Sequence, residues 1–310
     1  IRSGLEDVSF SRARKSLAWV IPIQESDQTM YVWCDALSNY ITAVGYGARR
    51  AREAAPFKKW WPADVHLVGK DITRFHAVFW PAMLMAARLP LPKKLLAHGF
   101  ITVDGQKMSK TLGNIIDPVA LVAKYGVDPV RYYLLRELPS DEDGDFSVAK
   151  FEARYRDDLS RGLGNFASRV SALAAPLRFA ASLKPSREVA AWARAAEKLV
   201  RENVDSFKLH DAVAAIFELV RRGDGYVNAH RVWASRDQRR VYDLVFLLLE
   251  VGRLIAPFLP ETSGRIIGAF ITSKGGTRVR KIVPLFPRRD QTSDVGSRSL
   301  DEGREDGKRG

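Results

Sequence analysis

Two lysines separated by two residues are the clearest candidates for chemistry in this sequence. Lys107 and Lys110 flank Met108-Ser109, downstream of a short β-favouring run and a turn at Asp104-Gly105. An ammonium group is a compact charge that contacts phosphate without bidentate geometry. The pair is therefore either solvated surface or a site for an anion, and a lysine loop of this kind suits the displacement of pyrophosphate from a nucleotide.

A second polar group follows a short apolar run, Val65–Val68, which ends in Gly69-Lys70-Asp71. Ligands of open α/β folds bind at the carboxyl ends of parallel strands. A glycine there allows close approach, and the Asp71 carboxylate could accept a hydrogen bond from a ribose hydroxyl. Asp71 is equally suited to cap a helix, since aspartate is a preferred N-cap residue.

The first part of the chain alternates strand and helix signals, which predicts a parallel sheet of the nucleotide-binding type. About three strands are visible where five or six are usual, so we expect half of such a domain. The expected strands are Met30–Trp33, Val65–Val68 and Leu95–Val103, and the expected helices are Asp35–Val44 and Thr73–Ala87.

From Phe146 onward strand signals fade, and the pattern predicts a helical bundle as a second domain. The expected helices are Val148–Arg161, Leu163–Ala175, Glu188–Asn203, Leu209–Asn228, Arg236–Phe258 and Thr262–Phe270. The acidic run Asp141–Asp145 lacks the spacing of a calcium loop and is expected to be a solvated turn before a helix opened by Ser147. The last residues carry few aliphatics and are expected to be disordered.

Composition excludes some classes of protein. One cysteine among 310 residues rules out a disulfide framework and favours a reducing, cytoplasmic setting. The longest apolar run, Val241–Leu259, carries three charges and so predicts a buried helix, not a membrane span. The net charge of +13 is spread along the chain, although residues 270–287 hold four basic residues and no acid. Such a charge suits either an RNA partner or simple solubility.

Lys107-Met108-Ser109-Lys110-Thr111 resembles the KMSKS signature of class I aminoacyl-tRNA synthetases, and the surrounding residues are similar to the methionyl-tRNA synthetases in particular. The similar stretches are residues 32–46, 66–84, 98–114, 125–137 and 143–147. The resemblance implies an α/β region followed by an all-α region. Its expected parts are the second half of a Rossmann-like catalytic domain at 1–117, a stem-contact connecting segment at 118–160, an anticodon-binding bundle at 161–287 and a tail at 288–310.

The resemblance also implies roles for individual residues. Lys107 and Lys110 would be catalytic, holding the β- and γ-phosphates of ATP and stabilising the departing pyrophosphate. The implied ATP-binding residues are Arg12, Gly69, Asp71, Ile101, Lys107, Ser109 and Lys110. The implied methionine-binding residues are Trp33, Ala36, Tyr40, Ile72 and His76, although ordinary core packing would also explain the aromatic ones. The implied anticodon contacts are Trp233, which could equally be core, and Asp224.

The sequence departs from the family pattern in the bundle and in the catalytic domain. In the bundle, Val232 replaces the usual proline. Asp224 stands where the family usually has an asparagine, and an aspartate cannot donate as an amide does. No His-x-Gly-His motif occurs in these residues, so the first half of the catalytic domain and its zinc-bearing insertion are expected to precede Ile1. The chain is then expected to be inactive alone and to carry no metal site of its own.

The implied activity is methionine–tRNA ligase, which joins methionine to ATP as methionyl-adenylate and transfers the acyl group to tRNA(Met). Magnesium would accompany ATP. Three alternatives stay open: a class I ligase for another amino acid, a non-catalytic tRNA-binding module, and a nucleotidylyltransferase that shares only the sheet and the lysine loop. The sequence leaves the oligomeric state open.

Overall fold

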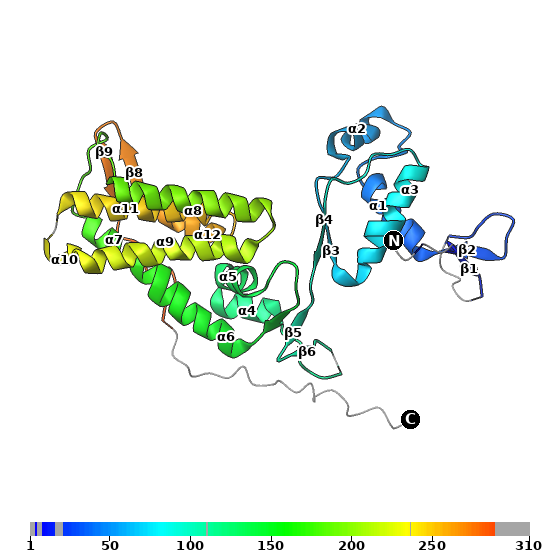
Figure 1. Cartoon of the computed structure of the whole chain (residues 1–310), viewed down its shortest axis with the longest axis horizontal. Coiled ribbons are helices and arrows are strands. Elements are labelled where there is room, and N and C mark those ends of the chain that lie inside the picture. Colours follow the sequence, from blue (N-terminus) through cyan, green and yellow to red (C-terminus); the bar gives the residue numbers. More distant parts are fainter. Residues whose placement is uncertain (1–3, 5–7, 16–20, 110, 236, 289–310) are drawn as a thin grey trace, which may run out of the picture.

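The computed structural model describes residues 4, 8–15, 21–109, 111–235 and 237–288. Lys110 and all but the first residue of the expected disordered tail at 288–310 lie outside this part. Figure 1 shows an N-terminal lobe and a helical lobe, which meet at the strands near residues 95–107. Within the described residues, no helix is both long enough and apolar enough to cross a membrane.

The N-terminal lobe begins with an antiparallel pair, β1 (Ser11–Ala13) and β2 (Gln28–Met30), followed at once by α1 (Val32–Thr42) and then α2 (Ala51–Trp60). The predicted buried strand Met30–Trp33 is therefore wrong. Met30 ends β2, Tyr31 is the extended N-cap of α1, and Val32 and Trp33 form its first turn, where Val32 is exposed. A short apolar run cannot by itself be told from the first turn of a helix.

The predicted parallel pair is confirmed, since β3 (His66–Gly69) pairs in parallel with β4 (Leu95–His98). A 3₁₀ turn at Lys70–Ile72, a π-helical turn at Phe75–Phe79 and α3 (Trp80–Ala86) connect them. The core of this lobe is small and rich in aromatic rings. It comprises Leu37, Ile41, Trp61, Trp80 and Leu84.

The predicted strand Leu95–Val103 is wrong in its length because it divides at Gly99. β5 (Ile101–Val103) lies in another sheet, parallel to β7 (Gly144–Phe146) and antiparallel to β6 (Gln106–Lys107). A Cβ at Gly99 would lie 2.0 Å from the carbonyl oxygen of Glu142, so the two segments approach too closely for any side chain. This crossing carries the chain from the first lobe to the second.

The second lobe starts with α4 (Pro118–Tyr125), α5 (Val127–Glu137) and α6 (Val148–Arg154). α6 passes directly into a π-helical segment, Tyr155–Gly164, and then into α7 (Asn165–Ala174), with helical backbone at each junction. The predicted break between Arg161 and Leu163 is therefore wrong. Leu159, Leu163 and Phe166 are fully buried, so one apolar stripe continues through the whole run.

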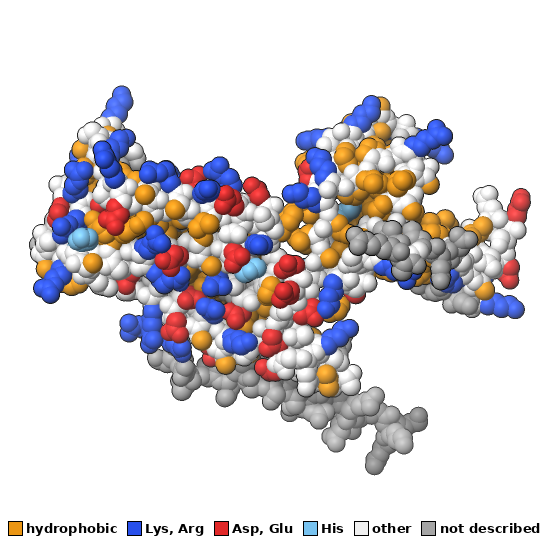
Figure 2. All heavy atoms as spheres, viewed as in Figure 1, with side chains coloured by type: hydrophobic (Ala, Val, Ile, Leu, Met, Phe, Trp, Pro, Cys, Tyr) orange, Lys and Arg blue, Asp and Glu red, His pale blue; other side chains and the backbone are white. Residues whose placement is uncertain are grey.

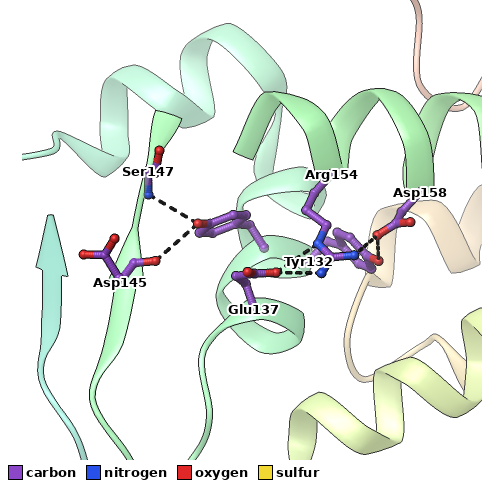
Figure 3. A network of polar contacts seen from close by, with 7 residues as sticks. Tyr132, Glu137, Asp145, Ser147, Arg154 and Asp158 are labelled. Carbon is purple, nitrogen blue, oxygen red and sulfur yellow. Dashed lines mark hydrogen bonds and ion pairs between the residues drawn. The ribbon is translucent and has the colours of Figure 1, made fainter. Parts of the chain in front are cut away.

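A network of polar contacts locks α5, β7 and α6 together (Figure 3). The Arg154 guanidinium contacts Glu137 Oε2 at 2.8 Å and Asp158 Oδ2 at 3.0 Å, and the Tyr132 hydroxyl donates to the same Asp158 oxygen at 2.7 Å. Burial, followed by the Asp158 charge, raises the pKa of Tyr132. The neighbouring Tyr133 hydroxyl donates to the Asp145 carbonyl at 3.4 Å and accepts from the Ser147 amide at 3.3 Å, which ties β7, the strand against which β5 pairs, to α5.

The bundle continues with α8 (Arg187–Asp205), α9 (Leu209–Ala229), α10 (Val232–Ser235), α11 (Gln238–Leu254) and α12 (Pro260–Ile267). The two predicted helices at 188–203 and 209–228 are confirmed within two residues. The observed helix α11 is shorter than the predicted helix Arg236–Phe258. After α12 the chain forms a hairpin of β8 (Phe270–Ser273) and β9 (Gly276–Val279), which the sequence pattern did not predict. Inside the bundle, buried Asp243 accepts hydrogen bonds from the Ser186 amide and the Tyr226 hydroxyl, at 2.7 and 2.9 Å.

Candidate active site and RNA-binding surface

Three candidate residues for the amino-acid pocket share one face of α1. Trp33, Ala36 and Tyr40 are spaced by three and four residues, so their side chains lie on the same side of the helix. Trp33 stacks on Phe75, with ring centroids 4.2 Å apart and planes 13° apart. Both Trp33 and Tyr40 are half-buried at the edge of the core instead of inside it, which leaves part of each ring available to a ligand.

His76 joins this face to the turn that follows β3. Its Nδ1 lies 3.0 Å from the Ile72 carbonyl oxygen, which can only accept, so Nδ1 carries the proton of the neutral ring. Nε2 is then an acceptor, and the Tyr40 hydroxyl donates to it at 2.9 Å. The structure thus brings the candidate residues Trp33, Tyr40, Ile72 and His76 together, and the hydrogen bonds fix the orientation of the imidazole.

A second histidine packs against Tyr40 and was not singled out from the sequence. His66 is buried, its ring is tilted by 48° against the Tyr40 ring with centroids 4.3 Å apart, and its Nε2 accepts a hydrogen bond from the Trp80 indole N–H at 3.1 Å. Burial lowers the pKa of His66, and the nearby His76 ring lowers it further. The imidazole is therefore held neutral, because a protonated ring would turn an N–H toward the indole N–H.

We expect the stability of the chain to fall on acidification because of His66. Its pKa is lower in the folded chain than in the unfolded chain, so unfolding takes up a proton below the unfolded value of about 6.5. The stabilisation is complete above that pH and is lost as pH falls toward the folded pKa. Thermal unfolding measured at pH 7.5 and 5.5 should show a drop in melting temperature. His66→Gln, whose amide oxygen can still accept from Trp80, should show a smaller drop than the unmodified chain. The control variant His98→Gln, at an exposed position, should show the same drop as the unmodified chain. An identical pH dependence for His66→Gln and the unmodified chain would contradict the assignment.

The turn after β3 places Asp71 close over Gly69. A Cβ added at Gly69 would lie 2.7 Å from Asp71 Oδ1, so the carboxylate occupies space that only glycine leaves free. Asp71 is exposed, and the turn Lys70–Ile72 has Gly69 at its N-cap with no side-chain hydrogen bond. The alternative role of Asp71 as a helix cap is therefore not observed.

Lys70 connects this turn to the strand that leads to Lys107. Its ammonium group contacts Asp143 Oδ2 at 2.6 Å and lies 4.8 Å from the centre of the Phe100 ring. The other Asp143 oxygen accepts from the Phe100 amide at 2.8 Å. These hydrogen bonds, the one from Lys70 first, lower the pKa of Asp143. The Lys107 ammonium lies 5.5 Å from the centre of the same Phe100 ring, so the Lys70 and Lys107 side chains both approach Phe100.

The hairpin that carries Lys107 is tightly built. Asp104 and Gly105 both have positive φ, as a two-residue turn between paired strands requires. Asp145 accepts from the Gly105 amide at 2.7 Å and from the Thr102 hydroxyl at 2.8 Å, and these contacts lower its pKa.

The expectation that Asp141–Asp145 is a solvated turn is confirmed for the exposed residues Asp141 to Asp143 and wrong for Asp145, which lies in β7. The expected helix start at Ser147 is also confirmed, since Ser147 is the N-cap of α6. Asp143 and Asp145 are not merely solvated, because each accepts a hydrogen bond from a backbone amide in the segment 100–105.

The loop beyond Lys107 is tied back by Asn114. Its side-chain oxygen accepts from the Ser109 amide at 2.8 Å, and its side-chain nitrogen donates to the Lys107 carbonyl at 3.3 Å. Ser109 is half-buried, whereas the Lys107 side chain is exposed. Ile101, at the start of β5, is 39% exposed, and its backbone pairs with that of Gly144 in β7. Lys110 lies outside the described residues.

Arg12 lies in the β1–β2 hairpin at the entrance to α1. Its guanidinium lies 4.3 Å from the centre of the Tyr31 ring and donates to the carbonyls of Ser9 and Ser11. Tyr31 immediately precedes α1, so Arg12 stands near the start of the helix that bears Trp33. No contact places it beside Lys107 within the described part of the chain.

The candidate RNA contacts in the bundle meet at a residue that sequence reasoning missed. Arg169 on α7 forms an ion pair with Asp224 at 2.6 Å, donates to Asn228 at 3.1 Å and lies 5.8 Å from the centre of the Trp233 ring. Trp233 is 49% exposed and is therefore not a core residue. The negative charge of Asp224 is neutralised by Arg169, while the amide of Asn228 stands beside it.

The missed residues share one property, which is that their partners are distant in the chain. Arg169 lies 55 residues from Asp224, and Lys70 lies 73 residues from Asp143. Neither pair leaves a local periodicity or a motif that would reveal it. The described residues contain no cluster of three or more His, Cys, Asp or Glu side chains suited to a metal ion.

Comparisons with known proteins agree on one family. The family profile described as "tRNA synthetases class I (M)" matches residues 1–171. The methionine–tRNA ligase of Clostridium acetobutylicum is 39% identical over 319 residues, covering 94% of this chain and 49% of the relative, and that of Brucella suis is 38% identical, with 60% of the relative covered. The chain thus spans about half the length of the curated relatives it matches.

Solved structures give the same result at the level of the fold. Mycobacterium tuberculosis methionyl-tRNA synthetase in complex with methionyl-adenylate superposes with a TM-score of 0.81 at 35% identity, covering 93% of this chain and 61% of that one. Its free form gives a TM-score of 0.79 at 33% identity. The agreement extends over both lobes, since nearly the whole chain is matched.

Proposed function

Because the chain belongs to the class I (M) family of tRNA synthetases, we propose that it forms part of a methionine–tRNA ligase. The enzyme would condense methionine with ATP to methionyl-adenylate and transfer the acyl group to tRNA(Met). We assign residues 1–117 to the second half of the catalytic domain, 118–160 to the connecting segment and 161–287 to the anticodon-binding bundle. The single cysteine suits a cytoplasmic enzyme.

The observation that carries the proposal is the aromatic pocket built on α1. A methionine side chain is unbranched and polarizable, and its sulfur gains roughly 0.3–1.5 kcal/mol from aromatic edges. Trp33 and Tyr40 offer such edges, and Ala36 between them leaves room on the helix face. The His76 ring, oriented by Ile72 and Tyr40, would close the pocket.

The second half of the site would receive ATP. Gly69 and Asp71 would contact the ribose, the backbone at Ile101 would lie along the adenine, and Lys107, Ser109 and Lys110 would approach the phosphates. Arg12 is assigned to the ATP side with only its position at the start of α1 in support. Magnesium would arrive with the phosphates of ATP. Catalysis would consist of positioning the two substrates and of stabilising the charge that develops on the departing pyrophosphate.

For the tRNA, the bundle offers an exposed indole with a guanidinium beside it. Trp233 would stack on an unpaired base, and Arg169 would contact the base or its phosphate. Asp224 would act by holding Arg169 in place, not by reading a base itself. This role removes the difficulty of an aspartate at a position where an amide is usual.

The test is amino-acid-dependent exchange of pyrophosphate into ATP. The enzyme would be a chimera in which the N-terminal half of the Mycobacterium tuberculosis relative precedes residue 1 of this chain. We expect exchange with methionine and none with leucine or cysteine. Exchange driven by another amino acid would favour a different class I ligase. A chimera that binds tRNA but supports no exchange, beside an active parent enzyme, would favour a non-catalytic module.

A further inference from the structure

The β8–β9 hairpin is a basic feature that the proposed function does not use. Residues 270–287 contain Lys274, Arg278, Arg280 and Lys281 and no acidic residue. All four side chains are exposed. Figure 2 shows Lys and Arg side chains gathered over this hairpin, which projects from the bundle in Figure 1.

The hairpin is held rigidly by the segment before α8. Phe179 and Thr277 exchange backbone hydrogen bonds of 2.9 and 2.8 Å, and the Arg178 guanidinium donates to the Gly275 carbonyl at 3.1 Å. Gly276 has a φ of +115°, and a Cβ there would lie 2.1 Å from the Phe179 carbonyl oxygen. The turn is thus fitted closely to its support, which fixes the direction in which Lys274 projects.

The register of the hairpin separates a packed side from a charged side. Val279 is 2% exposed and faces the bundle, so its neighbours Arg278 and Arg280 face outward, as alternation along a strand requires. Arg280 donates to the Gly268 carbonyl. Within the described residues, no ion pair joins Lys274, Arg278 or Lys281 to an acid. Their charges are therefore available to an external anion.

This charged side lies at the end of the bundle that carries Trp233. The side chain of Gln238, the first residue of α11, donates to the Arg178 carbonyl at 3.0 Å, and α10 with Trp233 directly precedes α11. Figure 1 places α10 and the hairpin at the same end. An RNA strand with a base stacked on Trp233 would have its backbone near the hairpin.

We infer that the β8–β9 hairpin is a phosphate-contacting arm that binds the backbone of the RNA held at Trp233. This inference rests on the proposed function, because it takes the RNA to be the tRNA bound by the bundle. The chemistry is that of ammonium and guanidinium groups on phosphodiester oxygens, which carries no base specificity. It adds affinity through the release of counterions, so it predicts a definite salt dependence.

The experiment compares the binding of in vitro transcribed tRNA(Met) by the 310-residue chain at a series of salt concentrations. The test variant combines Lys274→Gln, Arg278→Gln and Lys281→Gln. The control combines Arg52→Gln, Lys58→Gln and Lys59→Gln on α2, which removes the same charge from exposed side chains of the other lobe. Lys274→Gln alone is a milder second variant, and thermal unfolding checks that all variants fold.

We expect the slope of log K against log salt to become shallower by about 0.7–0.9 for each phosphate that is no longer neutralised, hence by about 2–3 in the triple hairpin variant. The affinities should converge as the salt approaches 1 M, and the α2 control should keep the slope of the unmodified chain. Non-cognate tRNA should lose as much affinity as tRNA(Met). An unchanged slope in the hairpin variants, or an equal change in the α2 control, would overturn the inference. Failure of the unmodified chain to bind tRNA at low salt would instead contradict the proposed function.

Discussion

Lys107→Ala should slow the formation of methionyl-adenylate by roughly 10²–10³-fold, the loss typical of removing one group that stabilises transition-state charge. The Lys107 side chain starts from a hairpin whose turn and strand pairing are fixed, and its ammonium group lies 5.5 Å from the centre of the Phe100 ring. The backbone position of Lys107 is therefore set before ATP binds. We expect Lys110→Ala to have an effect of similar size, since the second lysine of the pair would contact the same phosphates.

The measurement is single-turnover formation of methionyl-adenylate by the chimera with the Mycobacterium tuberculosis N-terminal half, at saturating ATP and methionine. Lys58→Ala serves as the control because this lysine is equally exposed but lies on α2, away from the proposed ATP site. Retention of the unmodified rate by Lys107→Ala would remove the lysine from the mechanism. A higher KM for ATP with an unchanged rate would indicate that it binds the substrate and the transition state equally.

The two lysines near Phe100 have different electrostatic surroundings, and this difference assigns them different tasks. Lys70 is paired with Asp143 at 2.6 Å, so much of its charge is already balanced. Lys107 forms no ion pair among the described residues. Lys70 therefore joins the turn after β3 to the segment before β7, while Lys107 keeps an unbalanced charge, as its proposed contact with the phosphates of ATP requires.

Sequence patterns predicted the elements whose signals are local. The parallel pair β3–β4 follows from two short apolar runs separated by a helical pattern, and α8 and α9 follow from long stripes at helical spacing. The turn at Asp104-Gly105 is confirmed because that dipeptide favours the positive φ values found there. The family resemblance added the candidate residues for methionine binding, of which the structure brings Trp33, Tyr40, Ile72 and His76 together.

The features that were wrong depend on contacts between distant segments. Leu95–Val103 reads as one strand, yet the close approach of residue 142 to Gly99 divides it between two sheets. Asp143 and Asp145 were predicted to be solvated acids. Each instead accepts a hydrogen bond from a backbone amide at least 40 residues away in the sequence, that of Phe100 or Gly105. The β8–β9 hairpin is short, and it is held by backbone hydrogen bonds to the distant residue Phe179. The local sequence therefore shows no periodic pattern that would predict it.

At Trp233 we expect a stacking contact with an RNA base instead of a contact with phosphate. Trp233→Ala should weaken the binding of tRNA(Met) by roughly 5- to 150-fold, which corresponds to about 1–3 kcal/mol for one stacked base. The indole is half-exposed, and Arg169 lies over it without covering it, so a base can stack on the free part of the ring. Stacking involves no counterions, so this loss should be the same at low and high salt, unlike the loss caused by the hairpin variants.

Equilibrium binding of the 310-residue chain to tRNA(Met) measures the effect, and the chain supplies its own control. Trp60 is 60% exposed and has the Lys59 ammonium 4.7 Å from its ring centre, so Trp60→Ala removes a similar indole–cation pair from the other lobe. Trp60→Ala should leave the affinity unchanged, while Trp233→Phe should restore part of it because a phenyl ring keeps a stacking face. Equal losses from Trp233→Ala and Trp60→Ala would show that the bundle has no specific platform for the base, and Arg169 would then be a structural partner of Asp224 alone.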